Sequence, residues 1–189
     1  ILLRNMPRGK RQVSFAFNLT SIRLLCGLLC FAFYNASVNA APKLSGRVTG
    51  QVVSVYDGDT LTLQIAGVDH QIRFEHIDTP EVRPSQPHGI EARDALKALV
   101  EGKTVDVEVS GQDRYNRNLG VVFVGQQNIN LQLVKDGHAW HYEEYSKDPQ
   151  YGVAQNQSKQ AGKGLWADPN SIAPWEFRKN PNATPTTTP

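Results

Sequence analysis

The stretch Val52–Leu63, VVSVYDGDTLTL, places two aspartates on either side of a glycine inside an apolar pattern. The valines before this triplet predict one β-strand, and the strict alternation of apolar residues over 61–65 predicts a second. Gly58 allows a tight start of the second strand, and we assign Asp57 to the turn. Asp59 begins the second strand, where folding alone does not require a carboxylate. This residue is therefore a candidate for a functional site.

Three further strands and a helix continue the pattern. Alternating apolar residues predict strands in QIRFEHI (71–77), TVDVEVSG (104–111) and NLGVVFV (118–124). Apolar residues from Ala92 to Val100 recur at spacings of three and four, which predicts a helix between the third and fourth strands.

Two more helices are predicted towards the C-terminus. The segment 129–136 ends before Gly137, a residue suited to the C′ position of a helix. Asp148 and Pro149 are typical of an N-cap and a first helical residue.

Five short strands with a helix after the third predict a small closed barrel of the OB type, in the mainly β (α+β) class. Strands and helices are too interleaved for a sandwich, and the helices are too short for a parallel α/β sheet. We expect the folded domain to span residues 46–179, with Trp166 and Trp175 anchoring its C-terminal segment on the barrel.

Charged residues gather where the first three strands begin or end, and these ends can meet at one rim of a barrel. Asp59 begins the second strand, and Arg73 lies within the third. Asp78 and Glu81 follow the third strand, and Arg117 ends the turn before the fifth. Each arginine alone is compatible with an ordinary surface role. Together with the carboxylates, they predict a site of acidic side chains and two guanidinium groups.

These residue types indicate phosphodiester chemistry. Carboxylates and a backbone carbonyl are hard oxygen ligands that suit Ca²⁺ or Mg²⁺ and not zinc. Thr79 is a candidate for the carbonyl, because Pro80 restricts it to an extended conformation. Arginine forks match phosphate oxygens and stabilise a transition state that gains negative charge. Glu81 is a candidate to orient or deprotonate the attacking water.

Three motifs in this order resemble the staphylococcal nuclease (thermonuclease) family. They are DGDTLTL, then RFEHIDTPE after nine residues, and later DRYNRNLGVVF. The resemblance covers nearly the whole domain, including GHAW and the C-terminal GLWADP and PWEFR of secreted bacterial members. It implies an OB-fold barrel with three α-helices and a Ca²⁺-dependent nuclease that acts on DNA and RNA and leaves 3′-phosphate ends. The implied calcium ligands are Asp59, Asp78 and the carbonyl of Thr79.

The resemblance also implies roles at the substrate. Arg73 and Arg117 would bind the scissile phosphate, and Glu81 would be the water-orienting group or general base. Tyr115 would contact another phosphate or the sugar of the nucleotide. Asn116 stands where the family usually has Gly or Gln, and Asn tolerates the left-handed backbone that aims Arg117. The stacking tyrosine of the family has no single match, so the choice stays open among Trp140, Tyr142 and Tyr145.

Other functions fit the sequence less well. One alternative is a non-catalytic OB module, like the degenerate copies of this domain in eukaryotic scaffold proteins. Those copies lack some of the carboxylates or arginines, whereas this sequence keeps all five charged residues. An oligosaccharide- or protein-binding OB domain would leave the group unexplained. His138 and His141 lie three residues apart without a further ligand nearby in the sequence, so we expect surface or packing roles. We expect a structural role for His76.

The first forty residues resemble a secretory signal. A basic start precedes an apolar run of eleven residues, Leu24–Tyr34, and then small residues. This run is shorter than the roughly 20 residues that span a bilayer, so an uncleaved anchor is disfavoured. Leu29 disfavours lipoprotein cleavage at Cys30. We expect translation to start at Met6 and cleavage after Ala40, with a secreted or periplasmic product and no membrane attachment.

Removing residues 1–40 changes the charge of the chain. The segment carries five of the 20 basic residues and none of the 18 acidic ones, which leaves 15 against 18 and a net charge of −3. A generally basic nucleic-acid binder is therefore not indicated, and DNA or RNA must meet a local group of arginines. Both cysteines lie in the segment. We expect a monomer without a stable protein partner, and a disordered tail over 180–189.

Overall fold

The computed structural model of this protein describes residues 43–181. The expected signal segment, residues 1–40, and the tail from residue 182 onward lie outside this range, so the expected export stays a prediction. The first strand begins at Gly46 and the last helix ends at Lys179. Within residues 43–181, no helix has both the length and the apolar composition needed to cross a bilayer.

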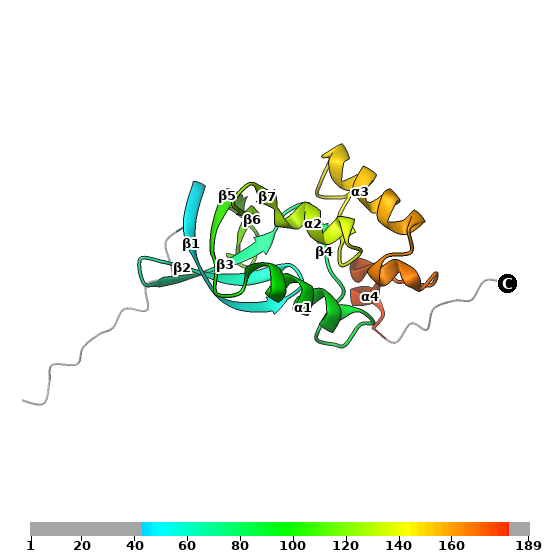
Figure 1. The fold of residues 1–189 in the computed structure, drawn as a ribbon. Coiled ribbons are helices and arrows are strands. Elements are labelled where there is room, and N and C mark those ends of the chain that lie inside the picture. The colour runs from blue at the N-terminus through cyan, green and yellow to red at the C-terminus, as the bar shows by residue number, and fades with distance from the viewer. Residues whose placement is uncertain (1–42, 182–189) are drawn as a thin grey trace, which may run out of the picture. The chain divides into compact units, whose positions relative to one another are not determined.

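Five strands form a closed barrel (Figure 1). They are β1 (Gly46–Asp57), β2 (Thr60–Ile65), β3 (Val68–Phe74), β5 (Thr104–Gln112) and β6 (Asn118–Val124). Neighbours pair in the order β3-β2-β1-β5-β6, and β3 closes the barrel by pairing in parallel with β6 over residues 72–74. The short strand β7 (Gln127–Asn128) follows at the edge of β6. The prediction of a five-stranded OB-type barrel with helices is confirmed.

Strand β1 belongs to both sides of the barrel. Its residues 46–51 pair with β5, and its residues 51–57 pair with β2. The register with β2 shifts between Val52 and Ser54 and again between Val55 and Asp57. Such irregularities bend a strand and increase its twist. One long strand can therefore cross the barrel and deliver the DGD turn to its rim.

The barrel is filled by side chains that alternate along the strands. The apolar residues of the five barrel strands with at most 2% exposure in this core are Val52, Leu61, Leu63, Ile72, Phe74, Val105, Val107 and Val122. Because successive side chains of a strand point to opposite faces, this spacing of two keeps the other face of each strand outside the core.

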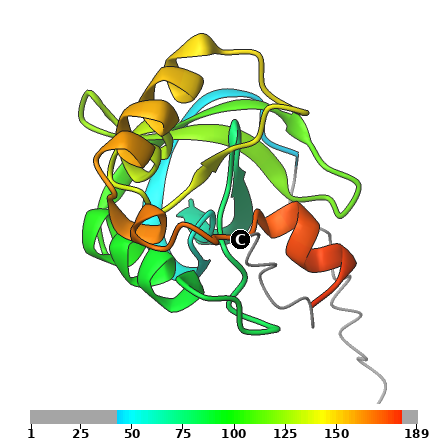
Figure 2. The ribbon, with the colours of Figure 1, turned by 90° about the vertical axis from the view of Figure 1, so that its right-hand side faces the viewer.

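Within residues 43–181, four α-helices surround the barrel. They are α1 (Gly89–Val100), α2 (Ile129–Lys135), α3 (Pro149–Gln160) and α4 (Pro174–Lys179). Figure 2 shows α1 in green, α3 in yellow to orange and α4 in red, spaced around the barrel. The first three confirm the predicted helices. Gly137 follows α2 with φ of 76°, and the Asp148 side chain accepts a hydrogen bond from the backbone N of Gln150 at 2.9 Å.

Several short elements were not predicted. Strands β4 (Ile77–Asp78) and β8 (Trp140–His141) pair with each other outside the main sheet, and a 3₁₀ turn covers Gly164–Ala167. A strand of two residues has no periodicity to recognise. Helix α4 has six residues, too few to show a helical repeat, although Pro174 stands at its first turn.

A buried asparagine holds the closure of the barrel. Asn130, in α2, is 0% exposed, and its Nδ2 donates to the carbonyl oxygens of Glu75 at 2.9 Å and Gly120 at 3.1 Å. Its Oδ1 accepts from the backbone N of Val122 at 3.0 Å. These bonds satisfy main-chain groups just past β3 and within β6, where the parallel pairing of these strands ends.

Candidate active site

Asp59 is placed by the tight turn between β1 and β2. A β-carbon on Gly58 would stand 2.9 Å from the Cβ atoms of Thr79 and Ala92, so only glycine lets the turn pack against them. The Oδ1 of Asp57 accepts a hydrogen bond from the backbone N of Asp59 at 3.1 Å. The Asp59 side chain is 0% exposed.

The pairing of β4 with β8 positions Asp78. Asp78 lies opposite Trp140 in this pairing and is 0% exposed. The next residue, Thr79, donates from its backbone N to the Oδ2 of Asp59 at 2.8 Å. This bond fixes the segment after β4 against the DGD turn, although 20 residues separate the two partners.

Arg73 joins the two aspartates. It lies near the end of β3, opposite Thr60 in β2. Its Nη2 donates to the Oδ1 of Asp78 at 2.5 Å, and its Nη1 forms an ion pair with the Oδ1 of Asp59. Buried charges are tolerated when they are paired and hydrogen-bonded. One guanidinium therefore holds two buried carboxylates at one place.

Glu81 lies in the loop between β4 and α1. Its backbone N donates to the Oε1 of Gln86 at 3.0 Å, and its carbonyl oxygen accepts from the backbone N of Gln86 at 2.9 Å. A β-carbon on Gly89 would stand 2.3 Å from the Glu81 carbonyl oxygen, so the loop requires glycine at the start of α1. The backbone of Glu81 is thus fixed, while its side chain is 23% exposed.

A further guanidinium, which was not predicted from the sequence, reaches the same carboxylates. Arg178 in α4 donates from Nη2 to the Oδ2 of Asp78 at 2.7 Å. Its Nη1 donates to the Oε1 of Glu81 at 2.7 Å and to the Oδ1 of Asp78 at 3.2 Å. Burial disfavours the charge of Arg178, but the hydrogen bonds and charges of Asp78 and Glu81 outweigh burial and raise its pKa.

Arg117 and Tyr115 lie on the loop between β5 and β6. The Nε of Arg117 donates to the Oδ2 of Asp113 at 2.7 Å, and the Oδ1 of Asp113 accepts from the backbone N of both loop residues. The expected left-handed backbone of Asn116 is confirmed by its φ of 62°. Tyr115 is exposed, with the Arg117 guanidinium 5.5 Å from its ring centroid. Within residues 43–181, no hydrogen bond joins Arg117 or Tyr115 to the three carboxylates of the site.

The electrostatic environment of Asp57 shows that the loop between β5 and β6 lies near the DGD turn. Burial raises the pKa of Asp57, while the charges of Arg73 and Arg117 act against burial. Arg117 therefore lies within electrostatic reach of the DGD turn. The Oδ1 of Asp57 is used by the backbone N of Asp59, as a turn residue requires.

The donor set fits a hard divalent cation. Asp59 and Asp78 share one cationic group, the guanidinium of Arg73. Within residues 43–181, no group of three or more acidic, His or Cys side chains is placed to hold a metal ion, so the candidate donors are these two carboxylates and a backbone carbonyl. Thr79 is 3% exposed, and its backbone N–H donates to the Asp59 carboxylate. The carbonyl of Thr79 is the predicted third donor. Oxygen donors of this kind suit Ca²⁺ or Mg²⁺.

Comparison with known proteins agrees with this arrangement. The sequence profile of a family described as "Staphylococcal nuclease homologue" matches residues 71–168, which is just over half of the chain. The chain belongs to the staphylococcal nuclease family. The family match includes Arg73, Asp78 and Glu81, whereas Asp59 lies before it and Arg178 lies after it.

Individual known proteins are also similar over most of the domain. A protein of Escherichia coli O157:H7 named "Uncharacterized endonuclease" is 41% identical over 138 residues, which cover 72% of this chain and 89% of that protein. A protein of the same name from Haemophilus influenzae is 45% identical over 132 residues, 69% of this chain and 73% of that protein. "Staphylococcal-like nuclease CAN1" of Arabidopsis thaliana is 40% identical over 110 residues, 58% of this chain and 33% of that protein.

The histidines lie in packing contacts. His76 Nδ1 and His141 Nε2 lie 2.9 and 3.0 Å from the hydroxyl of Ser146. His138 lies against His88, with 5.2 Å between the ring centroids. The expectation of structural roles for these side chains agrees with these contacts.

The tryptophans anchor the C-terminal segment, as expected. Trp140 lies 4.3 Å from Trp166 and 5.7 Å from Trp175 between ring centroids, edge-on in both cases. The ring of Tyr142 stacks on Trp175 at 5.1 Å with an interplanar angle of 3°. Tyr145 is exposed, and its ring centroid lies 4.7 Å from that of Tyr142.

Proposed function

We propose that this protein is a Ca²⁺-dependent phosphodiesterase that hydrolyses DNA and RNA and leaves 3′-phosphate ends. The observation that carries the proposal is the bridge of Arg73 between the buried carboxylates of Asp59 and Asp78, beside the partly exposed Glu81. Membership of the family and the endonuclease names of its members support nuclease chemistry.

In this proposal, Asp59, Asp78 and the carbonyl of Thr79 hold the ion. A bound Ca²⁺ supplies positive charge that stabilises the negative charge developing on the phosphate oxygens. The buried carboxylates keep their oxygens free of bulk water, which strengthens their hold on any cation between them.

Two arginines bind the scissile phosphate. Arg73 offers its guanidinium from the centre of the carboxylate group, and Arg117 offers its own from the loop between β5 and β6, where Asp113 holds it. Arginine donors bind two oxygens of one phosphate at once. Because the phosphate gains charge at the transition state, these donors stabilise that state more than the bound substrate.

Glu81 handles the attacking water. Its carboxylate oxygen orients a water molecule towards phosphorus or takes its proton as the new P–O bond forms. The bond between phosphorus and the 5′ oxygen breaks, and the 5′ oxygen leaves with a proton from solvent. The phosphate stays on the 3′ oxygen, and no covalent enzyme intermediate forms.

A digestion assay tests this function. Purified protein is incubated with plasmid DNA or RNA in Ca²⁺, Mg²⁺ or EGTA, and the product ends are probed for 3′-phosphate. We expect Ca²⁺-stimulated cleavage of both substrates and none in EGTA. Absence of Ca²⁺-stimulated cleavage by the wild-type protein would overturn the proposal and leave a nucleic-acid-binding module as the better description.

Two site variants and one surface variant sharpen the assay. Arg73→Ala and Glu81→Ala are expected to lower turnover by several powers of ten, each tenfold corresponding to about 1.4 kcal/mol. Arg93→Ala removes an arginine of α1 that pairs with Asp94, and it is expected to keep the wild-type rate. A full rate for Glu81→Ala would show that its assigned role is wrong.

A further inference from the structure

We propose that Arg178 is a positioning residue of the active site that holds Asp78 and Glu81 and competes with the divalent cation for the Asp78 carboxylate. This inference rests on the proposed function. Arg178 lies ten residues beyond the end of the family match at residue 168, so its place follows from the fold of this chain.

Arg178 forms a bidentate ion pair with Asp78, unlike a single-contact ion pair on the surface. Nη2 and Nη1 bind the two carboxylate oxygens of Asp78, at 2.7 and 3.2 Å, while Nη1 also binds Glu81 at 2.7 Å. Bidentate arginine–carboxylate pairs combine charge with fixed geometry. Arg73 binds the Oδ1 of Asp78 as well, so both oxygens of this carboxylate are engaged by guanidinium groups.

The net charge of the site makes the guanidinium of Arg178 important. Three carboxylates, those of Asp59, Asp78 and Glu81, face two guanidinium groups, those of Arg73 and Arg178. Without Arg178, one cation would remain against three anions. Two of these anions are completely buried, where uncompensated charge is most costly.

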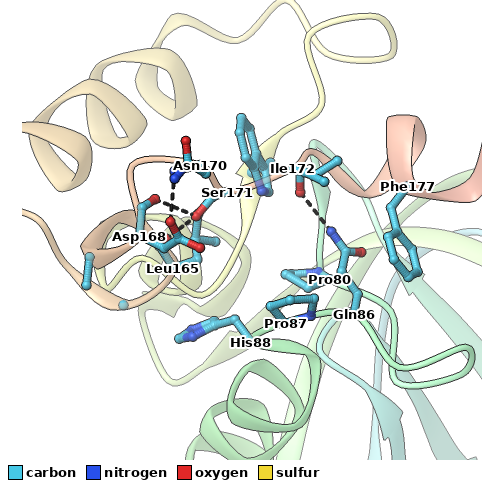
Figure 3. A pocket seen from close by; sticks show the side chains of 13 residues that line it. Pro80, Gln86, Pro87, His88, Leu165, Asp168, Asn170, Ser171, Ile172 and Phe177 are labelled. Atoms are coloured by element: carbon cyan, nitrogen blue, oxygen red, sulfur yellow. Dashed lines mark hydrogen bonds between the residues drawn. The ribbon is translucent and has the colours of Figure 1, made fainter. Parts of the chain in front are cut away.

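The neighbourhood of Arg178 holds α4 in a defined place. Phe177 is 5% exposed, and Trp175 stacks on Tyr142. Gln86 accepts from the backbone N of Glu81 and donates from Nε2 to the carbonyl oxygen of Ile172 at 2.7 Å. Figure 3 shows this link across a pocket, with Phe177 beside Gln86. The loop that carries Glu81 and the segment that precedes α4 are therefore tied together.

A cation that binds Asp78 competes with Arg178, because guanidinium groups already use three of the roughly four lone-pair sites of this carboxylate and Arg178 supplies two of these contacts. Whether Arg178 moves aside or stays nearby as a like charge, it lowers the affinity of the site for the ion. Removing it is therefore expected to tighten ion binding. Removal also frees the Glu81 side chain, so turnover is expected to fall while ion affinity rises.

Calorimetric titration of the full chain with CaCl₂ tests the competition without an activity readout. Arg178→Gln is expected to bind Ca²⁺ about tenfold more tightly than the wild type. The expected gain in affinity is no larger than this because Arg178 is partly exposed and solvent screens its charge. Lys179→Gln is the matched control, because it removes the adjacent positive charge, which pairs with Glu176 at 2.9 Å. The control is expected to change affinity less than about twofold.

Turnover at saturating Ca²⁺ tests the positioning. Arg178→Gln is expected to lower kcat with a smaller change in KM, and Arg178→Lys is expected to restore part of kcat. A residue that only stabilised the fold would lower ion affinity and turnover together. Unchanged or weaker Ca²⁺ binding by a folded Arg178→Gln, or a wild-type kcat, would overturn the inference.

A wild-type measurement covers the case in which Arg178→Gln does not fold. The side-chain Nε–H signal of Arg178, assigned with Arg178→Lys, is expected to shift during a Ca²⁺ titration followed by NMR. An unchanged signal at saturating Ca²⁺ would overturn the inference while leaving the proposed function intact. If the wild type neither binds Ca²⁺ nor cleaves nucleic acid, both proposals fail.

Discussion

The imidazole rings of His88 and His138 stack in the structure, with His88 Nε2 3.0 Å from His138 Nδ1. A hydrogen bond between two ring nitrogens requires at least one neutral ring. Burial lowers the pKa of both histidines, and the charge of His88 lowers that of His138 further. Glu91 acts against burial at both rings, and Asp136 does so at His138. The fold therefore favours the neutral pair.

This pair makes stability depend on pH in the mildly acidic range. Because the folded pKa values lie below the unfolded value of about 6.5, the stability contribution is complete above that pH and is lost as the pH falls through the folded values. We expect the free energy of unfolding to decrease as the pH falls below about 6.5. Urea denaturation at several pH values should show a smaller decrease for His138→Gln. Equal pH dependence in both proteins would contradict this explanation.

The turn that carries Asp59 tolerates no β-carbon at residue 58. Gly58→Ala is expected to lower the free energy of unfolding by about 1–3 kcal/mol through overpacking against Thr79 and Ala92. Turnover is expected to fall as well, because the shift displaces Asp59. Gly111→Ala is the control, since a β-carbon there meets no atom within 4 Å. Chemical denaturation of both variants checks the difference, and equal stability would show that the turn can relax.

The two aspartates of the DGD turn are expected to differ in Ca²⁺ binding. Asp57 holds the backbone N of Asp59, whereas the side chain of Asp59 shares Arg73 with Asp78. Asp59→Asn should weaken Ca²⁺ binding strongly, because it removes a charged ligand, and Asp57→Asn should weaken it less. Calorimetric titration measures both affinities. An equal loss in the two variants would refute the asymmetry.

Asn130 is expected to be the most sensitive polar residue of the core. Asn130→Ala removes the amide partner of the Glu75 carbonyl oxygen and of the Val122 backbone N–H, while the Gly120 carbonyl oxygen keeps the backbone N of Glu75. Since each unsatisfied buried group costs about 1–3 kcal/mol, we expect a loss of about 3 kcal/mol in the free energy of unfolding. Gln127→Ala changes an exposed side chain nearby and should stay within about 0.5 kcal/mol of wild type. A loss no larger than that of Gln127→Ala would show that water replaces the amide.

The barrel and the first part of the site were predictable for a local reason. Each strand shows its alternation within about ten residues, and the first three strands are consecutive hairpin partners. Charged residues at their ends, such as Asp59 and Asp78, must therefore lie near one another. Gly58 was recognised as the means of a tight turn, but its contact with Thr79 depends on a segment that follows the third strand.

Arg178 was beyond such reasoning. Its partner Asp78 lies 100 residues earlier in the chain, and α4 is too short for its pattern to show which side chain faces the barrel. The pairing of Arg117 with Asp113 was missed for a different reason. The turn could be predicted, but the direction of its side chains depends on a backbone conformation that only the folded loop reveals.

The separation between Asp78 and Arg178 also bears on how the protein is made. A ribosome adds residues in order, so the carboxylates of Asp78 and Glu81 are synthesised 100 and 97 residues before the guanidinium of Arg178 that pairs with them. Within residues 43–181, Asp78 has Arg73 as its other ion-pair partner, while Glu81 pairs with Arg178 alone and must wait for α4. The loop that must close to bring Arg178 back is the longest among the ion pairs of residues 43–181, and long loops close late in folding. The ion pairs that balance the charge of the site can therefore form only after residue 178 has been synthesised.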